Sequence, residues 1–388
     1  MCPIRLNGFG DEYRRPVRYV LFLAVPALLF VVPWWLLVYT STDGPLLAIG
    51  SAVFLLAFLA LPAAMILGHG RTQSDAAAVL GDSLLGVAWV LFSWSVLGAV
   101  ARAVLIVAGV DDPVRSRAVA IAVLAIAAGL IGWGIVEARR VPRIREVTVP
   151  IAGLGAGFDG ARLVVLTDTH YGPLNRLRWS QRVVEAVNAL SADIVCHTGD
   201  LADGPVARRR GQVDPLGKVA APLGRFYITG NHEYYGDAPG WIEHMAGLGW
   251  QPLHNEHRML ERGGDRLVLA GIDDPTGVTV PGHGPDLAAA LAGADSRLPV
   301  VLLAHQPKQI ADAVSAGVAL QISGHTHGGQ IWPFHYLVRL DQPVVAGLSQ
   351  HGPTQLYTSR GTGFWGPPLR VFAPSEITVL TLRSRVTA

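Results

Sequence analysis

The sequence has little charge, almost no lysine and almost no cysteine. Charged residues make up 15% of the 388 residues, the formal net charge is +2, and Lys218 and Lys308 are the only lysines. A chain of this kind lacks the basic surface that nucleic acids require, so we expect no nucleic-acid partner. The two cysteines, Cys2 and Cys196, are too few and too far apart for a disulfide framework or a cysteine-based zinc site.

Apolar residues are abundant instead, and most of the excess lies in the N-terminal part. They make up 51% of the chain, more than in an ordinary soluble protein. Four uncharged stretches meet or approach the length of about 20 residues with which a helix crosses a bilayer. They are residues 19–39, 45–68, 83–101 and 118–136. We therefore expect residues 1–146 to form a four-span transmembrane region with a basic juxtamembrane linker, and residues 147–388 to form a separate domain.

Arginines flank these stretches unevenly. They cluster before the first stretch and after the last: Arg5, Arg14, Arg15, Arg18, Arg139, Arg140, Arg143 and Arg145. The positive-inside rule then predicts a multi-pass protein of the cell membrane with both termini, and hence the C-terminal domain, in the cytoplasm. The basic segment 139–145 has two interpretations, since it either only sets this topology or also contacts anionic headgroups.

From about residue 147 onward, short β-rich apolar runs alternate with helical patterns. The predicted strands are residues 162–167, 193–198, 225–229, 266–272, 299–304, 319–323 and 376–382. The predicted helices are residues 178–190, 240–248 and 307–316. Strands that alternate with helices predict a layered α/β fold.

Polar motifs follow these strands directly, where open α/β sheets carry their active sites. Their candidate residues are Asp168, His170, Asp200, Asp203, Asn231, His232, His305, His325 and His327. In extended chain, residues i and i+2 face the same side, so Asp168 and His170 are expected to bind one metal together. Carboxylate, imidazole and amide ligands suit a divalent Mn, Fe or Zn ion. A shared carboxylate can hold two such ions about 3.5–4 Å apart.

Each motif alone is weak evidence, because a single Asp-x-His or Gly-Asp is also typical of ordinary turns. Five motifs in order, each at the end of a strand, are difficult to explain as unrelated turns and point to a metal site.

Together the motifs resemble the signature of calcineurin-like metallophosphoesterases. The series Asp-x-His, Gly-Asp-x-x-Asp, Gly-Asn-His-Glu, His and Gly-His-x-His lies within residues 162–382. The resemblance implies a two-sheet sandwich flanked by helices, that is, a four-layer α/β/β/α fold. It implies one metal held by Asp168, His170, Asp200 and His327, and a second held by Asp200, Asn231, His305 and His325. It also implies that His232 is not a ligand but stands over the phosphate. We expect His232 to donate a hydrogen bond or a proton to the departing oxygen.

The stretch 324–330 and the segment that begins at Ser359 look like the membrane-associated bacterial branch, some of whose members cleave a nucleotide-linked lipid. We therefore expect a membrane-anchored phosphoesterase in which a metal-bridging hydroxide attacks a phosphodiester or pyrophosphate. The expected substrate is a phosphorylated lipid, a nucleotide-linked lipid or a soluble phosphoester. The alternative is a non-enzymatic membrane scaffold or regulator with the same fold. The oligomeric state is left open.

Two further residues are weaker candidates. Arg360 is the best candidate for a contact with the anionic substrate among the loops that follow the metal motifs. Asp203 either orients a ligand histidine or merely forms a turn, and the sequence does not separate these two roles.

Overall fold

A computed structural model describes residues 27–174 and 176–385. The chain forms two compact units, Met1–Gly132 and Trp133–Ala388, and we describe each by itself.

The N-terminal unit consists of apolar helices. Three are long enough to cross a membrane: α2 (Gly44–His69), α3 (Asp75–Val107) and α4 (Val114–Arg139), of which α4 continues into the second unit. They confirm the second, third and fourth predicted spans as long apolar helices. Of the first predicted span, residues 19–26 lie outside the described residues, and the rest forms the shorter apolar helix Ala27–Tyr39, which ends in the π-helical turn η1 (Trp35–Tyr39).

Helix α3 begins well before the predicted span, which starts at residue 83. The helix includes the charged residue Asp82, which is buried. The carboxylate of Asp82 lies 2.9 Å from Nε2 of His69 on α2, and the side chain of Ser74 caps the helix by accepting from the N–H of Ala77. The two helices approach closely here, since a Cβ on Gly68 would lie 2.5 Å from Cα of Ala78. The polar pair therefore lies within a tight helix–helix contact.

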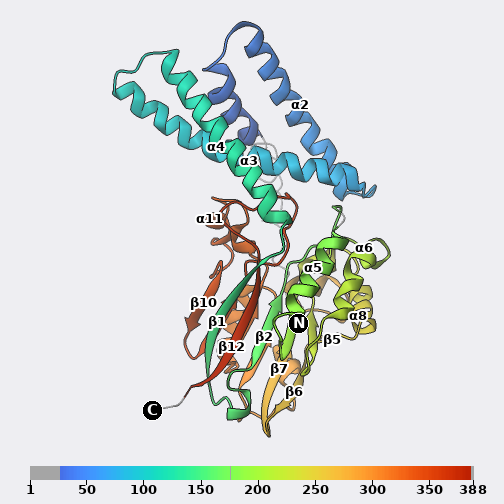
Figure 1. The fold of residues 1–388 in the computed structure, drawn as a ribbon. Coiled ribbons are helices and arrows are strands. Elements are labelled where there is room, and N and C mark those ends of the chain that lie inside the picture. The colour runs from blue at the N-terminus through green and yellow to red at the C-terminus, as the bar shows by residue number, and fades with distance from the viewer. Residues whose placement is uncertain (1–26, 175, 386–388) are drawn as a thin grey trace, which may run out of the picture. The chain divides into compact units, whose positions relative to one another are not determined.

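The second unit contains two six-stranded sheets (Figure 1). In the first sheet the strand order is β1-β12-β2-β3-β4-β5, and in the second it is β10-β11-β9-β8-β7-β6. The first sheet comprises β1 (Arg143–Ala152), β2 (Arg162–Leu166), β3 (Ile194–Thr198), β4 (Arg225–Ile228), β5 (Gln251–Pro252) and β12 (Glu376–Arg385). The second comprises β6 (Glu256–Arg262), β7 (Asp265–Gly271), β8 (Val300–Leu303), β9 (Leu320–Ser323), β10 (Gly347–His351) and β11 (Thr354–Thr358).

Helices and short turns connect the strands. The α-helices are α5 (Leu177–Asn188), α6 (Val206–Val213), α7 (Asn231–Tyr235), α8 (Ala238–Gly247), α9 (Leu287–Leu291), α10 (Ile310–Ser315) and α11 (His335–Val338). The 3₁₀ turns are η2 (Ala156–Phe158), η3 (Asp214–Lys218), η4 (Pro275–Thr279), η5 (Pro307–Gln309) and η6 (His327–Gly329). The predicted strands and helices all have counterparts here, with small shifts at their ends.

Strand β1 is an edge strand that the sequence did not predict. It pairs in parallel with β12 over its whole length, and most of its side chains are exposed, as is usual at a charged sheet edge. Its first residues are arginines of the segment that was predicted as a linker, so the boundary predicted between residues 146 and 147 falls within this strand. Glu137 of α4 lies 2.8 Å from Arg143, the first residue of β1, and 3.6 Å from Arg140, which precedes the strand.

Three apolar clusters hold the second unit together. Between the sheets, residues such as Leu163 and Phe226 pack against Leu303 and Ile322, and Cys196 is buried among them. Helices α5 and α8 pack on β2, β3 and β4 in a second cluster, and α9 and α10 pack on β7 and β8 in a third. Burial raises the pKa of the Cys196 thiol, as expected of a cysteine that serves as a small apolar residue.

Candidate metal centre

The predicted motif residues lie just beyond the ends of five neighbouring strands. Strands β2, β3, β4, β8 and β9 end at Leu166, Thr198, Ile228, Leu303 and Ser323. Each motif begins within two residues of its strand, as the sequence predicts. The two sheets therefore present their motifs at the same edge of the sandwich.

The local geometry differs from the extended chain that was expected. Asp168, His170, Asp200, His325 and His327 all have positive φ angles, between 43° and 69°. Left-handed backbone is costly for non-glycine residues and concentrates at functional sites. The expected extended backbone is therefore wrong here, although Asp168 and His170 do lie in one group. The chain turns sharply at each motif, and His325 and His327 enter different groups of side chains.

Glycines beside the motifs permit this crowding. A Cβ on Gly324 would collide with the carboxylate of Asp168, and a Cβ on Gly230 would collide with that of Asp200. Both carboxylates thus lie against the bare backbone of a glycine at another strand end, which explains why glycine precedes His325 and Asn231.

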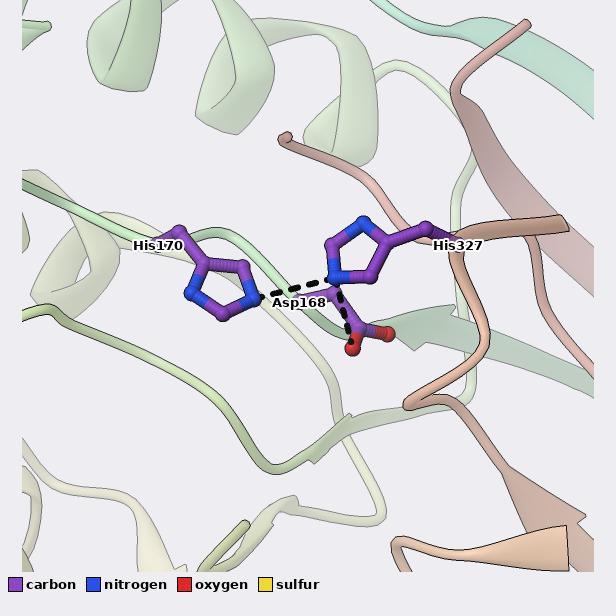
Figure 2. A group of neighbouring side chains, drawn as sticks. All are labelled: Asp168, His170 and His327. Atoms are coloured by element: carbon purple, nitrogen blue, oxygen red, sulfur yellow. Dashed lines mark hydrogen bonds and ion pairs between the residues drawn. The ribbon is translucent and has the colours of Figure 1, made fainter. Parts of the chain in front are cut away.

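The first group of side chains is Asp168, His170 and His327 (Figure 2). Nε2 of His170 lies 3.1 Å from Nε2 of His327, and Nε2 of His327 lies 3.5 Å from Oδ1 of Asp168. The same Asp168 oxygen accepts the backbone N–H of His325 at 2.9 Å, which ties β2 to the loop after β9.

The second group is Asp200, His305 and His325. Oδ2 of Asp200 lies 3.3 Å from Nε2 of His305 and 3.5 Å from Nε2 of His170, so this carboxylate oxygen lies between the two groups. The other oxygen, Oδ1, accepts the backbone N–H of His232 at 2.9 Å, which places the neighbouring Asn231 beside the group.

Several buried atoms of these groups have no hydrogen-bond partner among the described residues. They are Oδ2 of Asp168, Oδ1 of Asn231 and Nε2 of His305. Nδ1 of His305 donates to the carbonyl of Thr198 at 2.7 Å, so Nε2 is the ring nitrogen that faces Asp200 and would bind a cation once it loses its proton. Buried acceptors without donors are costly. Carboxylate, amide and imidazole acceptors that converge in this way fit divalent cations.

The two histidines of the first group share a hydrogen bond between their Nε2 atoms. Nη2 of Arg370 lies 3.2 Å from Nδ1 of His327, so the hydrogen-bond partners assign the proton of the neutral His327 ring to Nε2. Nδ1 of His170 lies 2.9 Å from Asp203, which leaves Nε2 of His170 as the acceptor that faces His327. A cation bound between these two nitrogens would displace this proton.

Burial and neighbouring charges set the protonation of the second group. Burial lowers the pKa of His325 to about 3, and His305 acts in the same direction. His325 is therefore neutral, the form in which imidazole binds a metal. Burial alone would raise the pKa of Asp200, but His305, His232 and His170 together hold it well below its ordinary value. Asp200 is therefore an ionised carboxylate.

Asp203 lies between two histidines. Its Oδ1 is 2.9 Å from Nδ1 of His170 and 2.8 Å from Nδ1 of His232. His232 is mostly buried, and its ring contacts those of Tyr235 and Trp365. Burial would lower the pKa of His232, but Asp200 and Asp203 raise it to about 9, so the ring carries a proton at neutral pH.

Two buried ionisable residues, Glu233 and Arg370, support the site in ways that the sequence did not indicate. The carboxylate of Glu233, in the first turn of α7, accepts the backbone N–H groups of Gly230, Asp200 and Leu201. It thereby joins the motif after β4 to the motif after β3. Arg370 donates to the carbonyls of His327, Gly363 and Ala373, which ties the last histidine of the site to a distant loop. No spacing pattern signals such contacts, because their partners are backbone atoms.

Arg360 lies beside the first group through its backbone. Its side chain is half-buried and packs over Gly328, its N–H donates to Glu376, and its carbonyl accepts from Arg370. The next residue, Gly361, is so close to Asp168 that a Cβ there would lie 3.0 Å from Cβ of Asp168.

A further histidine and carboxylate group lies outside the predicted motifs. It consists of His254, Asp273 and His283. Asp273 accepts from Nδ1 of His254 at 2.7 Å and from the N–H of Gly284 at 3.1 Å, and it lies 3.4 Å from His283. These bonds satisfy the buried Asp273 and close the loop that contains η4.

The sequence of this chain is similar to those of known metallophosphoesterases. The family model for calcineurin-like phosphoesterases matches residues 161–329. Over 248 residues the chain is 33% identical to the uncharacterized metallophosphoesterase YkuE of Bacillus subtilis, an alignment that covers 63% of this chain and 85% of that protein. The chain belongs to the calcineurin-like metallophosphoesterase family.

Other relatives of this metallophosphoesterase also carry membrane segments or have no assigned activity. It is 40% identical over 271 residues to a transmembrane protein with metallophosphoesterase domain from Danio rerio, which covers 67% of this chain and 62% of that protein. It is 38% identical over 251 residues to an uncharacterized metallophosphoesterase of Helicobacter pylori, with 64% and 66% covered. The chain thus spans less than two thirds of the length of these two relatives.

Proposed function

We propose that this chain is a membrane-anchored, metal-dependent hydrolase of phosphodiester or pyrophosphate bonds. The proposal rests on two adjacent His and carboxylate groups, which Asp200 of the second group connects to His170 of the first. Buried atoms of these groups lack hydrogen-bond partners among the described residues. A scaffold that only retained the fold would have no use for such a set, since each unpaired buried acceptor costs stability.

The proposed ligand sets follow the two groups. Asp168, His170, Asp200 and His327 would hold one divalent cation, and Asp200, Asn231, His305 and His325 the other. Mn, Fe and Zn all accept these donors. When bound, such ions supply an activated water and charge that stabilises the phosphoryl oxygens. Glu233 and Arg370 fix the motif loops whose side chains would hold these ions.

We assign His232 to the leaving group. Asp203 holds Nδ1 of His232 at 2.8 Å, so the opposite ring nitrogen, Nε2, is the one free to donate a proton to the departing oxygen. Asp203 also holds His170, so we propose that this carboxylate orients both histidines rather than serving as a turn residue. Arg360 is the proposed contact of the substrate anion.

The substrate class follows from the anchor. A tethered enzyme meets membrane lipids at a high effective concentration, so we propose a phosphorylated or nucleotide-linked lipid as the substrate. We further propose four spans, counting the helix that includes Ala27–Tyr39, and a catalytic domain with a four-layer α/β/β/α core in the cytoplasm. The domain boundary at residues 146/147 stays part of this proposal.

The test uses the full chain, purified in detergent and loaded with Mn. We expect it to cleave bis(p-nitrophenyl) phosphate and nucleotide-linked lipids, and a chelator to abolish both activities. We expect His232→Ala to lower kcat by about 10²–10⁴-fold, the usual range for loss of a general acid, while metal content is retained.

The matched control is His257→Ala, because His257 lies outside the His and carboxylate groups and bonds the carbonyl of Ala290. It should retain wild-type kcat. Cleavage that persists in chelator, or equal kcat in His232→Ala and His257→Ala, would contradict the proposal.

A further inference from the structure

An arginine-lined cavity lies next to the end of α4. It has a volume of about 460 Å³, and its lining includes Arg139, Arg176, Arg178, Arg182 and Trp179. All of these residues belong to the unit Trp133–Ala388, and none of them is among the proposed metal ligands. We name this cavity the arginine pocket.

The innermost cation of the arginine pocket is Arg176. It is 5% exposed and lies between two aromatic rings, 3.6 Å from the centre of Trp179 and 4.5 Å from that of Phe364. Nη1 donates to the carbonyl of Thr169 at 2.7 Å, whereas Nη2 is buried and has no hydrogen-bond partner among the described residues. A buried guanidinium with a free N–H group calls for an acceptor that the described chain does not supply.

The same pocket contains the start of a helix. Helix α5 begins directly after Arg176, it is 12 residues long, and it has neither a side-chain cap nor an acidic residue in its first turn. The N–H groups of a first helical turn carry partial positive charge, and helix starts of this kind bind phosphate groups. The helix start and Arg176 therefore favour the same kind of ligand.

Three exposed arginines add to this charge. The described residues include no ion-pair partner for Arg139, Arg178 or Arg182, in contrast to Arg140 and Arg143, which pair with Glu137. The pocket lining contains four arginines and no acidic residue. Several cations would thus attract an anion bound there. The N–H groups of arginine match the geometry of phosphate well.

The pocket also lies where a membrane helix ends. Arg139 is the last residue of the apolar helix α4, and Nε1 of Trp179 donates to the carbonyl of the following residue, Arg140, at 2.9 Å. Residues at the ends of spanning helices lie near the headgroup layer, where phosphate is the dominant anion.

We propose that the arginine pocket is a phosphate-binding site distinct from the metal centre. Its ligand is a phosphomonoester or phosphodiester group, which a lipid headgroup or a free phosphate compound would supply. Arg176 connects the two sites, because the carbonyl that it holds belongs to Thr169, between Asp168 and His170. The proposal does not depend on the hydrolytic activity and is tested by binding.

The test measures binding of two probes to the full chain in detergent by calorimetry. One probe is a short-chain phosphatidylglycerol and the other is inorganic phosphate. The variant R178Q/R182Q removes two exposed cations, so folding should not suffer, whereas a change at Arg176 would disturb the Thr169 loop. The matched control R210Q/R385Q removes two exposed arginines outside the pocket and outside the basic segment 139–145. Melting temperature and metal content should equal those of the wild type in both variants.

We expect R178Q/R182Q to bind at least one probe about tenfold more weakly or worse, and R210Q/R385Q to bind like the wild type. Any phosphate bound at the metal centre is common to all three proteins, so the difference reports the pocket. Loss for phosphatidylglycerol alone identifies a lipid headgroup as the ligand, loss for inorganic phosphate alone a soluble phosphate compound, and loss for both a general phosphate site. Equal binding by the R178Q/R182Q variant, an equal loss in the control, or no binding of either probe to the wild type would overturn the proposal.

Discussion

The two sheets of the second unit contribute different side chains to the same site. The first sheet supplies both carboxylates and the amide, after β2, β3 and β4, together with His170. The second sheet supplies only histidines, after β8 and β9. Neither sheet alone carries a complete set, so the site exists only when the apolar core between the sheets has formed. With the proposed ligand sets, metal binding would therefore require the folded domain.

The two sheets also differ in what sets the position and protonation of their side chains. Asp200 on the first side is fixed by backbone, since its carboxylate accepts from His232 and its own N–H donates to Glu233. On the second side, His325 is kept neutral by burial, which lowers its pKa to about 3. The first sheet thus provides ordered negative charge, and the second provides a neutral imidazole at His325.

The largest effect is expected at the residue between the two groups. Asp200→Ala should lose both metals and lower kcat by more than about a thousandfold, because one carboxylate serves both ions. Metal analysis and turnover of bis(p-nitrophenyl) phosphate provide the measurement. The exposed Asp312 supplies the control Asp312→Ala, which should behave like the wild type. Two metals retained in the Asp200→Ala protein would contradict the proposal that Asp200 binds both ions.

A smaller effect is expected when the second sheet alone is altered. His325→Ala should lose one metal and keep the other, because the group Asp168, His170 and His327 does not include His325. Turnover should fall by at least about a hundredfold, beyond the usual loss for residues that only support a ligand. Metal analysis of the purified variant decides the matter, since loss of both ions would show that the two groups are not separable.

The interface between the sheets can be tested without touching a ligand. Leu303→Ala should destabilise the domain by about 2–5 kcal/mol, because Leu303 is fully buried between the sheets. Leu340 is 84% exposed, so Leu340→Ala should cost no more than about 0.5 kcal/mol. Thermal denaturation of the two variants, followed by fluorescence, compares them directly. A similar melting temperature for both would contradict the coupling of packing and site.

The smallest effect is expected at Arg360, in the loop after β11. Arg360→Gln should raise KM by about tenfold and change kcat less, as expected of a residue that binds the substrate anion in both ground and transition states. The control is Arg258→Gln, since Arg258 pairs with Glu256 on the edge strand β6. A pure loss of kcat in Arg360→Gln would assign Arg360 a role in transition-state stabilisation instead.

The sequence by itself determined the elements and the chemistry. Hydrophobic length identified the three helices long enough to cross a membrane, and alternating apolar runs identified seven strands of the two sheets. Motif residues such as Asp168 and His305 could be selected because each follows a strand directly, and the order of the motifs is a property of the chain alone. Their assignment as ligands is still a prediction.

The tertiary structure decided everything that depends on contacts between distant segments. Asp168 meets the backbone of His325, which is 157 residues away, and Asp203 lies between His170 and His232. Edge strand β1 looked like a basic linker because its charges suit either state, and only its pairing with β12 makes it a strand. Glu233, Arg370 and Arg176 were missed for one physical reason, since their partners include backbone carbonyls and N–H groups that carry no signature in the sequence. The sequence thus identifies the candidate residues of the site. The residues that the two groups share, the side chains that bond to backbone atoms and the arginine pocket depend on how distant segments of the chain pack.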